Sequence, residues 1–241
     1  MKNILYVIAM EKEAKGIVKE LELKKVEGAK LKIYEKGSTR LLITGIGKQR
    51  VAMNLAIYME NYEKPDIIIN LGYAGSTNSE IGTWVNVSEI YNYEWEIPGE
   101  EKYTMDGIDN KELIVKVEDE KINKLPCYTA EKFVTGTTIS EDVLFDMELH
   151  SIYLICCIHG IKLLSLKKVS DNLSLDNYYE NIDIESLMEL TSGLEYCKMQ
   201  WKRNFYGKRN NSNWWWIGRM WGSIPDCKKR NKSKIVWNET I

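Results

Sequence analysis

Three acidic side chains of this 241-residue chain follow predicted strands or begin predicted helices. Glu13 falls in the first turn of a helix expected after a strand over residues 3–9, and Glu148 lies near the start of another helix. Asp171 follows a strand expected over 161–169, and the carboxyl ends of strands are where open α/β sheets bind ligands. Such carboxyl groups can act as acids, bases or hydroxyl acceptors. The same positions also suit structural acids, because Asp caps helices and Glu favours helix N-termini.

Three segments carry a resemblance to a known family. They are YVIAMEKEA at 6–14, KPDIIINLGYAGS at 64–76, and the long segment at 145–172 that begins FDMELH and ends LKKVSDN. Together they resemble the signature segments of the 5′-methylthioadenosine/S-adenosylhomocysteine nucleosidase family. The resemblance covers about residues 3–197 and is thin over 96–126. It implies a three-layer nucleoside-phosphorylase-like fold, with a central mixed sheet flanked by helices.

The resemblance implies hydrolysis of a purine–ribose bond, without a cofactor or a metal. Such a cleavage passes through an oxocarbenium-like state, so the leaving base must be protonated and a water must be activated. Asp171 matches the family's acid, which protonates purine N7 and therefore needs a raised pKa. Ser170 would orient it. AMEKE at 9–13 resembles the family's AMEEE, and Glu13, which matches the third acid of that motif, would activate the water.

Further positions match the family's substrate-binding residues. DMEL resembles the family's EMEA, which implies that Met147 packs on the sugar and that Glu148 accepts hydrogen bonds from both ribose hydroxyls. EKFVTG loosely resembles DAFING, which implies a base slot at Phe133 and Val134. Asp146 is a departure, because the family has Glu there.

The glycines after the second buried strand predict a tight turn that brings the backbone close to a ligand. The glycines are Gly72 and Gly75, and Ala74 is the further small residue of the expected turn. Tyr73 within the turn departs from the family, which has a small hydroxyl residue there. Its bulk leaves the preferred 5′-substituent of the substrate open.

Other functions stay open on the sequence. The wider superfamily includes nucleoside phosphorylases, which need arginines to hold phosphate. Arg50 is the only candidate near the matching segments, and Glu13 would repel phosphate, so hydrolysis is favoured. Methylthioadenosine or S-adenosylhomocysteine is the expected substrate, with a futalosine-type nucleoside as an alternative. A non-catalytic nucleoside-binding relative is an alternative of another class, although all three carboxylates are present.

Charge and cysteine content exclude several classes of partner. Residues 1–197 carry 22 Lys and Arg against 33 Asp and Glu, and an acidic body argues against nucleic acid. No stretch approaches the roughly 20 apolar residues of a membrane helix. The cysteines lack metal-ligand spacing, and the sequence begins without a signal peptide. We therefore expect a cytoplasmic protein with free thiols, and the resemblance adds a homodimer.

Alternating strands and helices make the class α/β. Expected strands cover 3–9, 31–35, 40–45, 66–71, 84–94, 127–135 and 161–169. Expected helices cover 11–22, 48–62, 146–159 and 184–197.

Composition changes sharply near residue 198. Residues 198–241 hold six of the eight tryptophans and 11 Lys and Arg against two acids, and they show neither helical nor strand periodicity. We divide the chain into a nucleosidase-like domain over 1–197 and a basic, Trp-rich tail over 198–241. The tail has no counterpart in the resembled family.

Overall fold

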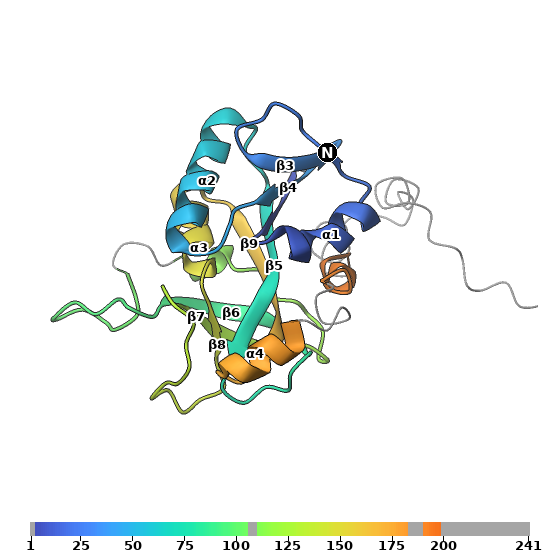
Figure 1. Cartoon of the computed structure of the whole chain (residues 1–241). Helices are drawn as coiled ribbons and strands as arrows, with labels where there is room; N and C mark the ends of the chain where they lie inside the picture. The colour runs from blue at the N-terminus through green and yellow to red at the C-terminus, as the bar shows by residue number, and fades with distance from the viewer. Residues whose placement is uncertain (1–2, 106–109, 183–189, 199–241) are drawn as a thin grey trace, which may run out of the picture. The chain divides into compact units, whose positions relative to one another are not determined.

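The structure, a computed structural model, describes residues 3–105, 110–182 and 190–198. A mixed sheet of nine strands forms its centre, with α1 on one side and α2 and α3 on the other (Figure 1). The strands are β1 Ile4–Ile8, β2 Lys24–Lys25, β3 Lys32–Lys36, β4 Thr39–Ile43, β5 Ile67–Ser76, β6 Trp84–Asn92, β7 Asn123–Thr129, β8 Leu144–Asp146 and β9 Lys162–Asp171. The helices are α1 Glu11–Glu20, α2 Lys48–Asn61, the short 3-10 turn η1 Lys111–Leu113, α3 Leu149–His159 and α4 Leu175–Ile182. The expected α/β class with a central mixed sheet is confirmed.

Part of the sheet closes into a ring. The strand order is β2-β3-β4-β1-β5-β8-β7-β6-β9. Because β9 also pairs with β5, the five strands β5, β8, β7, β6 and β9 form a closed ring. The first half of β5 lies between β1 and β9, and its last two residues pair with β8. The residues of β5 are buried on both faces of the sheet, which explains the continuous apolar run at its start.

The second half of β5 corrects the predicted glycine turn. Gly72, Ala74 and Gly75 continue the strand and pair with β9 instead of reversing the chain. The register shifts between Ala74 and Gly75, which is an irregularity within a strand and not a turn. The lack of a side chain at Gly75 instead allows β9 and its Asp171 carboxyl group to lie close to β5.

Other boundaries differ from the expected ones. The expected helix over 146–159 begins only at Leu149, because the residues before it form the unpredicted strand β8. The extended segment expected at 127–135 ends at Thr129. Residues 184–189 of the helix expected over 184–197 lie outside the described ones, and residues 193–198 are helical.

A continuous apolar core holds the sheet and helices together. Leu5, Ile68 and Leu163 come from three neighbouring strands, and all are fully buried. Helices α2 and α3 add Val51, Leu55 and Ile152 to the same cluster. The four cysteines of the described residues, at 127, 156, 157 and 197, are free thiols as expected. No helix among the described residues is long and apolar enough to cross a membrane.

The last described segment packs into the body of the molecule. Leu190, Leu194 and Cys197 are 2% exposed or less. The Trp84 indole N–H donates to Ser192 Oγ at 3.0 Å, and the ring lies against Gly193. Residues beyond 198 lie outside the described ones, so the proposed tail boundary stays a prediction.

We predict that Gly193→Ala destabilises the protein. A Cβ at residue 193 would lie 2.6 Å from Trp84 Cη2, so the indole must shift, at a cost of roughly 1–3 kcal/mol. Thermal unfolding of the variant should show a lower Tm. Gly136→Ala is the matched control, because its Cβ would meet no atom within 4 Å. Equal Tm values for both variants would show that residues 190–198 do not pack as described.

Candidate active site

Glu13 is fixed at the junction between β1 and α1. Its Oε2 accepts a hydrogen bond from the Met10 backbone N–H at 2.9 Å, which is the reciprocal half of a helix capping box. The side chain is only 4% exposed. Burial raises the pKa of Glu13 to about 7, the Met10 amide opposes this, and the negative charge of Glu148 adds to it. Glu13 is therefore poised to exchange a proton near neutrality.

Glu148 lies at the N-cap of α3 and faces the start of α2. Its Oε1 accepts from the Gly47 backbone N–H at 2.8 Å. Burial raises the pKa of Glu148 to about 7, and the nearby charge of Asp146 acts in the same direction. A carboxylate has two oxygen atoms with two lone pairs each, so Glu148 can accept further hydrogen bonds besides the one from Gly47.

Glu13 and Glu148 line one cavity. The sequence-predicted Gly72 and Tyr73 also line it. The other residues around it are Val7, Ala9, Thr44, Asn70, Leu71, Ile152 and Lys167. The two carboxylates predicted to bind water and ribose therefore face the same space.

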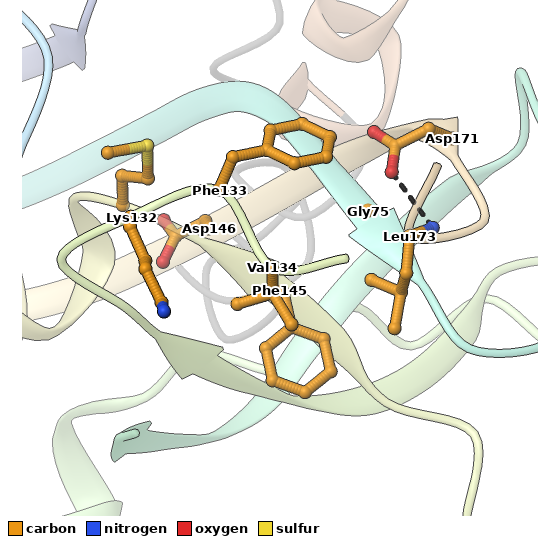
Figure 2. Close-up of a pocket in the computed structure, with 9 residues that line it drawn as sticks. Gly75, Lys132, Phe133, Val134, Phe145, Asp146, Asp171 and Leu173 are labelled. Carbon is orange, nitrogen blue, oxygen red and sulfur yellow. Dashed lines mark hydrogen bonds between the residues drawn. The ribbon is translucent and has the colours of Figure 1, made fainter. Parts of the chain in front are cut away.

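Asp171 lies at the end of β9 and is 1% exposed. Ser170 Oγ lies 2.7 Å from Asp171 Oδ2 and 3.3 Å from the carbonyl oxygen of Ala74. The Leu173 backbone N–H donates to Asp171 Oδ1 at 2.9 Å (Figure 2). Burial raises the pKa of Asp171, although the Ser170 hydrogen bond opposes that shift.

Asp171 lines a second cavity, together with three predicted substrate-binding residues (Figure 2). These three are Phe133, Val134 and Met147. Gly75, Lys132, Phe145, Asp146 and Leu173 complete its lining. The structure thus brings the predicted acid next to the predicted base slot.

Glu13 and Asp171 line different cavities, but several connections join the two spaces. Met147 of the second cavity and Glu148 of the first are consecutive residues. Tyr178 of α4 is near both groups. Burial raises the pKa of its hydroxyl most, followed by the charges of Glu13 and Asp171 and, less strongly, by that of Glu148. All three carboxylates are therefore within electrostatic reach of one hydroxyl.

The sequence reasoning missed Tyr178 and the helix that carries it. Its ring meets that of Phe133 edge to face, with centroids 5.2 Å apart. The signal was present, because residues 175–182 are amphipathic and follow Asp171 closely.

A buried ion pair joins the two cavities and was also missed. Lys167 Nζ lies 2.7 Å from Asp146 Oδ2, and the two side chains are 2% and 0% exposed. Asp146 also accepts from Thr129 Oγ1 and from the Leu149 backbone N–H. Lys167 lines the first cavity and Asp146 the second. The Lys167 charge lowers the pKa of both Glu13 and Glu148, against the effect of burial.

Gly75 was predicted to form a turn, but in the structure it leaves room for the Asp171 carboxyl group. A Cβ at this position would lie 2.8 Å from Asp171 Oδ1. Any side chain would push the carboxyl group away from its place beside β5. Gly72 is less restricted, because its Cβ would lie 3.5 Å from Lys167 Nζ, an ordinary contact.

The residues present fit acid–base chemistry better than metal chemistry. No group of three or more His, Cys, Asp or Glu among the described residues is arranged to hold a metal ion. His150 is buried, and its pKa is lowered to about 4 by burial and by the nearby Lys48 charge. The imidazole is therefore uncharged at neutral pH.

We predict that Glu13→Gln stabilises the protein at alkaline pH. In the folded state the pKa of Glu13 is about 7 against 4.5 for an ordinary Glu, so ionisation above pH 7 costs folding free energy. The neutral amide avoids this cost, a gain on the order of 2–3 kcal/mol above pH 7 that vanishes below pH 4.5. Denaturant unfolding across this pH range measures the difference. Glu11→Gln, at an exposed position of the same helix, is the control. A pH-independent difference would contradict the raised pKa.

Comparison with known proteins places this geometry in context. A sequence model of the phosphorylase superfamily matches residues 3–188. A comparison with curated protein sequences finds no match. Among solved structures, the 5′-methylthioadenosine/S-adenosylhomocysteine nucleosidase of Neisseria meningitidis, in complex with methylthio-immucillin-A, is 18% identical. It has a TM-score of 0.68, and the alignment covers 82% of this chain and 99% of that one.

Two further solved structures share the fold. The S-adenosylhomocysteine nucleosidase of Streptococcus pyogenes, in complex with 5-methylthiotubericidin, is 21% identical, with a TM-score of 0.66 over 82% of this chain and 96% of its own. A futalosine hydrolase mutant of Helicobacter pylori is 13% identical, with a TM-score of 0.68 over 83% of this chain and 98% of its own. At these identities the likeness concerns the fold. The match over residues 3–188 shows that this chain belongs to the phosphorylase superfamily.

Proposed function

We propose that this protein hydrolyses the N-glycosidic bond of an adenosine-type nucleoside and releases adenine. Methylthioadenosine and S-adenosylhomocysteine are the proposed substrates. The observation that carries the proposal is the buried Asp171 beside the cavity of Phe133, Val134 and Met147. A buried carboxyl with a raised pKa is suited to giving its proton to a leaving base.

The Ser170 hydroxyl supports the proposed orientation of Asp171. It donates to Asp171 Oδ2 at 2.7 Å, and the Ala74 carbonyl oxygen lies 3.3 Å from the same hydroxyl. This hydrogen bond opposes the rise in the Asp171 pKa, so burial is what favours the protonated acid. Ser170 therefore fixes the direction of the carboxyl group, and the buried position holds its proton.

The proposed reaction balances with the groups of the site. As the bond between the ribose C1′ and purine N9 breaks, its electron pair goes to the base, and Asp171 gives a proton to N7. The resulting positive charge on the sugar is captured at C1′ by a water oxygen, and Glu13 takes the water's proton. Glu148 holds the ribose hydroxyls. The products are adenine and the free sugar, and a proton passes from Glu13 back to Asp171 through solvent.

Hydrolysis is supported over phosphorolysis by the charges of the first cavity. Two carboxylates line it, and Lys167, the one cation among the described residues that line it, already pairs with Asp146. Arg50, the candidate phosphate ligand, is exposed, and its side chain lies against Gly45. A dianionic phosphate would therefore meet repulsion without the arginine clamp that phosphorolysis needs.

The 5′-substituent and the assembly are the finer parts of the proposal. Tyr73 lines the Glu13 cavity, and the bulk of its ring beside the sugar site leaves a futalosine-type nucleoside as an alternative substrate. A homodimer is proposed from the family resemblance. Ile46, Met53 and Ile158 expose apolar surface on or beside α2 and α3, and this surface is available for such a contact.

Base release tests the proposal directly. Chromatography should detect adenine from methylthioadenosine or S-adenosylhomocysteine without added phosphate, and phosphate should not increase the rate. Asp171→Asn should lower kcat by at least about 100-fold, since general acid catalysis contributes about 10²–10⁴-fold. Asp176→Asn, at an exposed position of α4, should leave the rate unchanged. Release that occurs only with phosphate would establish a phosphorylase, and nucleoside binding without release would favour the non-catalytic relative.

A second prediction concerns the ribose clamp. Glu148→Gln replaces a charged acceptor by an amide, which weakens hydrogen bonds to the 2′ and 3′ hydroxyls. The variant should lose activity on the ribonucleoside by tenfold or more and lose much less on the 2′-deoxy analogue. Measuring kcat/KM for both substrates with both proteins gives the answer. An equal loss on both would show that Glu148 does not bind the 2′ hydroxyl.

A further inference from the structure

Lys48, the first residue of α2, is buried but lines neither of the two cavities. Its ammonium group donates to Asn92 Oδ1 at 2.8 Å and to Glu94 Oε2 at 2.7 Å. Glu131 Oε1 lies 3.4 Å away on a third side. Two hydrogen bonds and one further ion pair therefore surround the ammonium group with acceptors of the protein. Lys48 is therefore fully engaged within the protein and is not placed to bind a ligand anion.

The residue before Lys48 touches the ribose-binding carboxylate. The Gly47 backbone N–H donates to Glu148 Oε1 at 2.8 Å. Gly47 has a φ of 97°, so the chain turns sharply into the helix at this point. Any shift of the α2 N-terminus would thus move the donor that holds Glu148.

The acceptors of Lys48 are connected to the segment that carries Phe133 and Val134 of the base slot. Glu94 accepts the Lys48 ammonium with Oε2 and the Glu131 backbone N–H, at 2.8 Å, with Oε1. Glu131 lies two residues before Phe133, which lines the Asp171 cavity. Asn92 ends β6, and the next residue, Tyr93, donates its backbone N–H to Thr129. One ammonium group therefore ties the α2 N-terminus to the segment that carries the slot.

We propose that Lys48 is a positioning residue that fixes the spacing between the ribose-binding Glu148 and the base slot at Phe133 and Val134. The inference rests on the proposed function. A nucleoside binds by its base and its sugar together, so a correct spacing between their binding groups lowers the cost of binding. Lys48 acts through Gly47 on one side and through Glu94 and Glu131 on the other, without touching the substrate.

The energetics separate this role from a general structural one. The side chains of Glu94 and Glu131 are 40% and 49% exposed, so solvent screens their attraction to Lys48. Losing the pair should therefore change global stability little. Binding depends on the relative placement of two groups, and it should respond more strongly.

Lys48→Met tests the proposal against the matched control Lys32→Met, which removes an exposed lysine paired with Glu11. We expect KM for methylthioadenosine to rise about tenfold in Lys48→Met, with kcat within about twofold and Tm close to the wild-type value. The control should match the wild type. Glu94→Gln should raise KM in the same direction, and the double variant of Lys48 and Glu94 should be no worse than Lys48→Met alone, because both act through one contact.

Each contrary result has a distinct meaning. An unchanged KM, or additive effects of the Lys48 and Glu94 substitutions, would overturn the positioning role. A fall in kcat at constant KM would also overturn it, since it would assign Lys48 to the chemical step. If the wild type releases no base from any nucleoside, the proposed hydrolysis is wrong. Calorimetry with adenosine then tests Lys48 separately, and equal dissociation constants for wild type and Lys48→Met would refute its role.

Discussion

A single buried cation lies among the acidic groups of the site. Lys167 pairs with Asp146 at 2.7 Å inside the sheet, and its charge also acts on Glu13 and Glu148. Burying a charge is costly unless a close partner and further hydrogen bonds compensate for it, and Asp146 is supplied with both. Without this cation the site would gather uncompensated negative charge in a space of low polarity. The acid–base chemistry of the site therefore depends on Lys167.

The burial that suits the acids to their chemistry also lowers the stability of the folded protein. Glu13, Glu148 and Asp171 all have raised pKa values, with burial as the first cause. A carboxyl group that resists ionisation can hold a proton for a leaving base, or can accept one near neutrality. The same burial works against the folded state whenever the group is charged. Perturbed acids that gather around cavities are typical of functional sites.

Sequence patterns predicted most elements but few of the contacts between them. Continuous apolar runs located β1 and the first half of β5, and the three signature segments pointed to the acids. The glycines of β5 were misread as a turn, because propensity describes the local chain while the pairing partner β9 lies far away in sequence. Lys167 was missed for a similar reason. A lysine in a strand usually faces solvent, and its partner Asp146 is distant in the sequence.

The closed ring of five strands has a consequence for how the protein folds. Asn70 of β5 and Ser165 of β9 bond to each other although they are 95 positions apart in the sequence. Contacts of such high order require a large loss of chain entropy before they form, which slows folding. The carboxyl end of β9 meets Gly75 only once this distant pairing is complete. The nascent chain must therefore emerge almost to the end of β9 before the acidic centre can exist, and until then the long apolar edge of β5 needs protection from other chains.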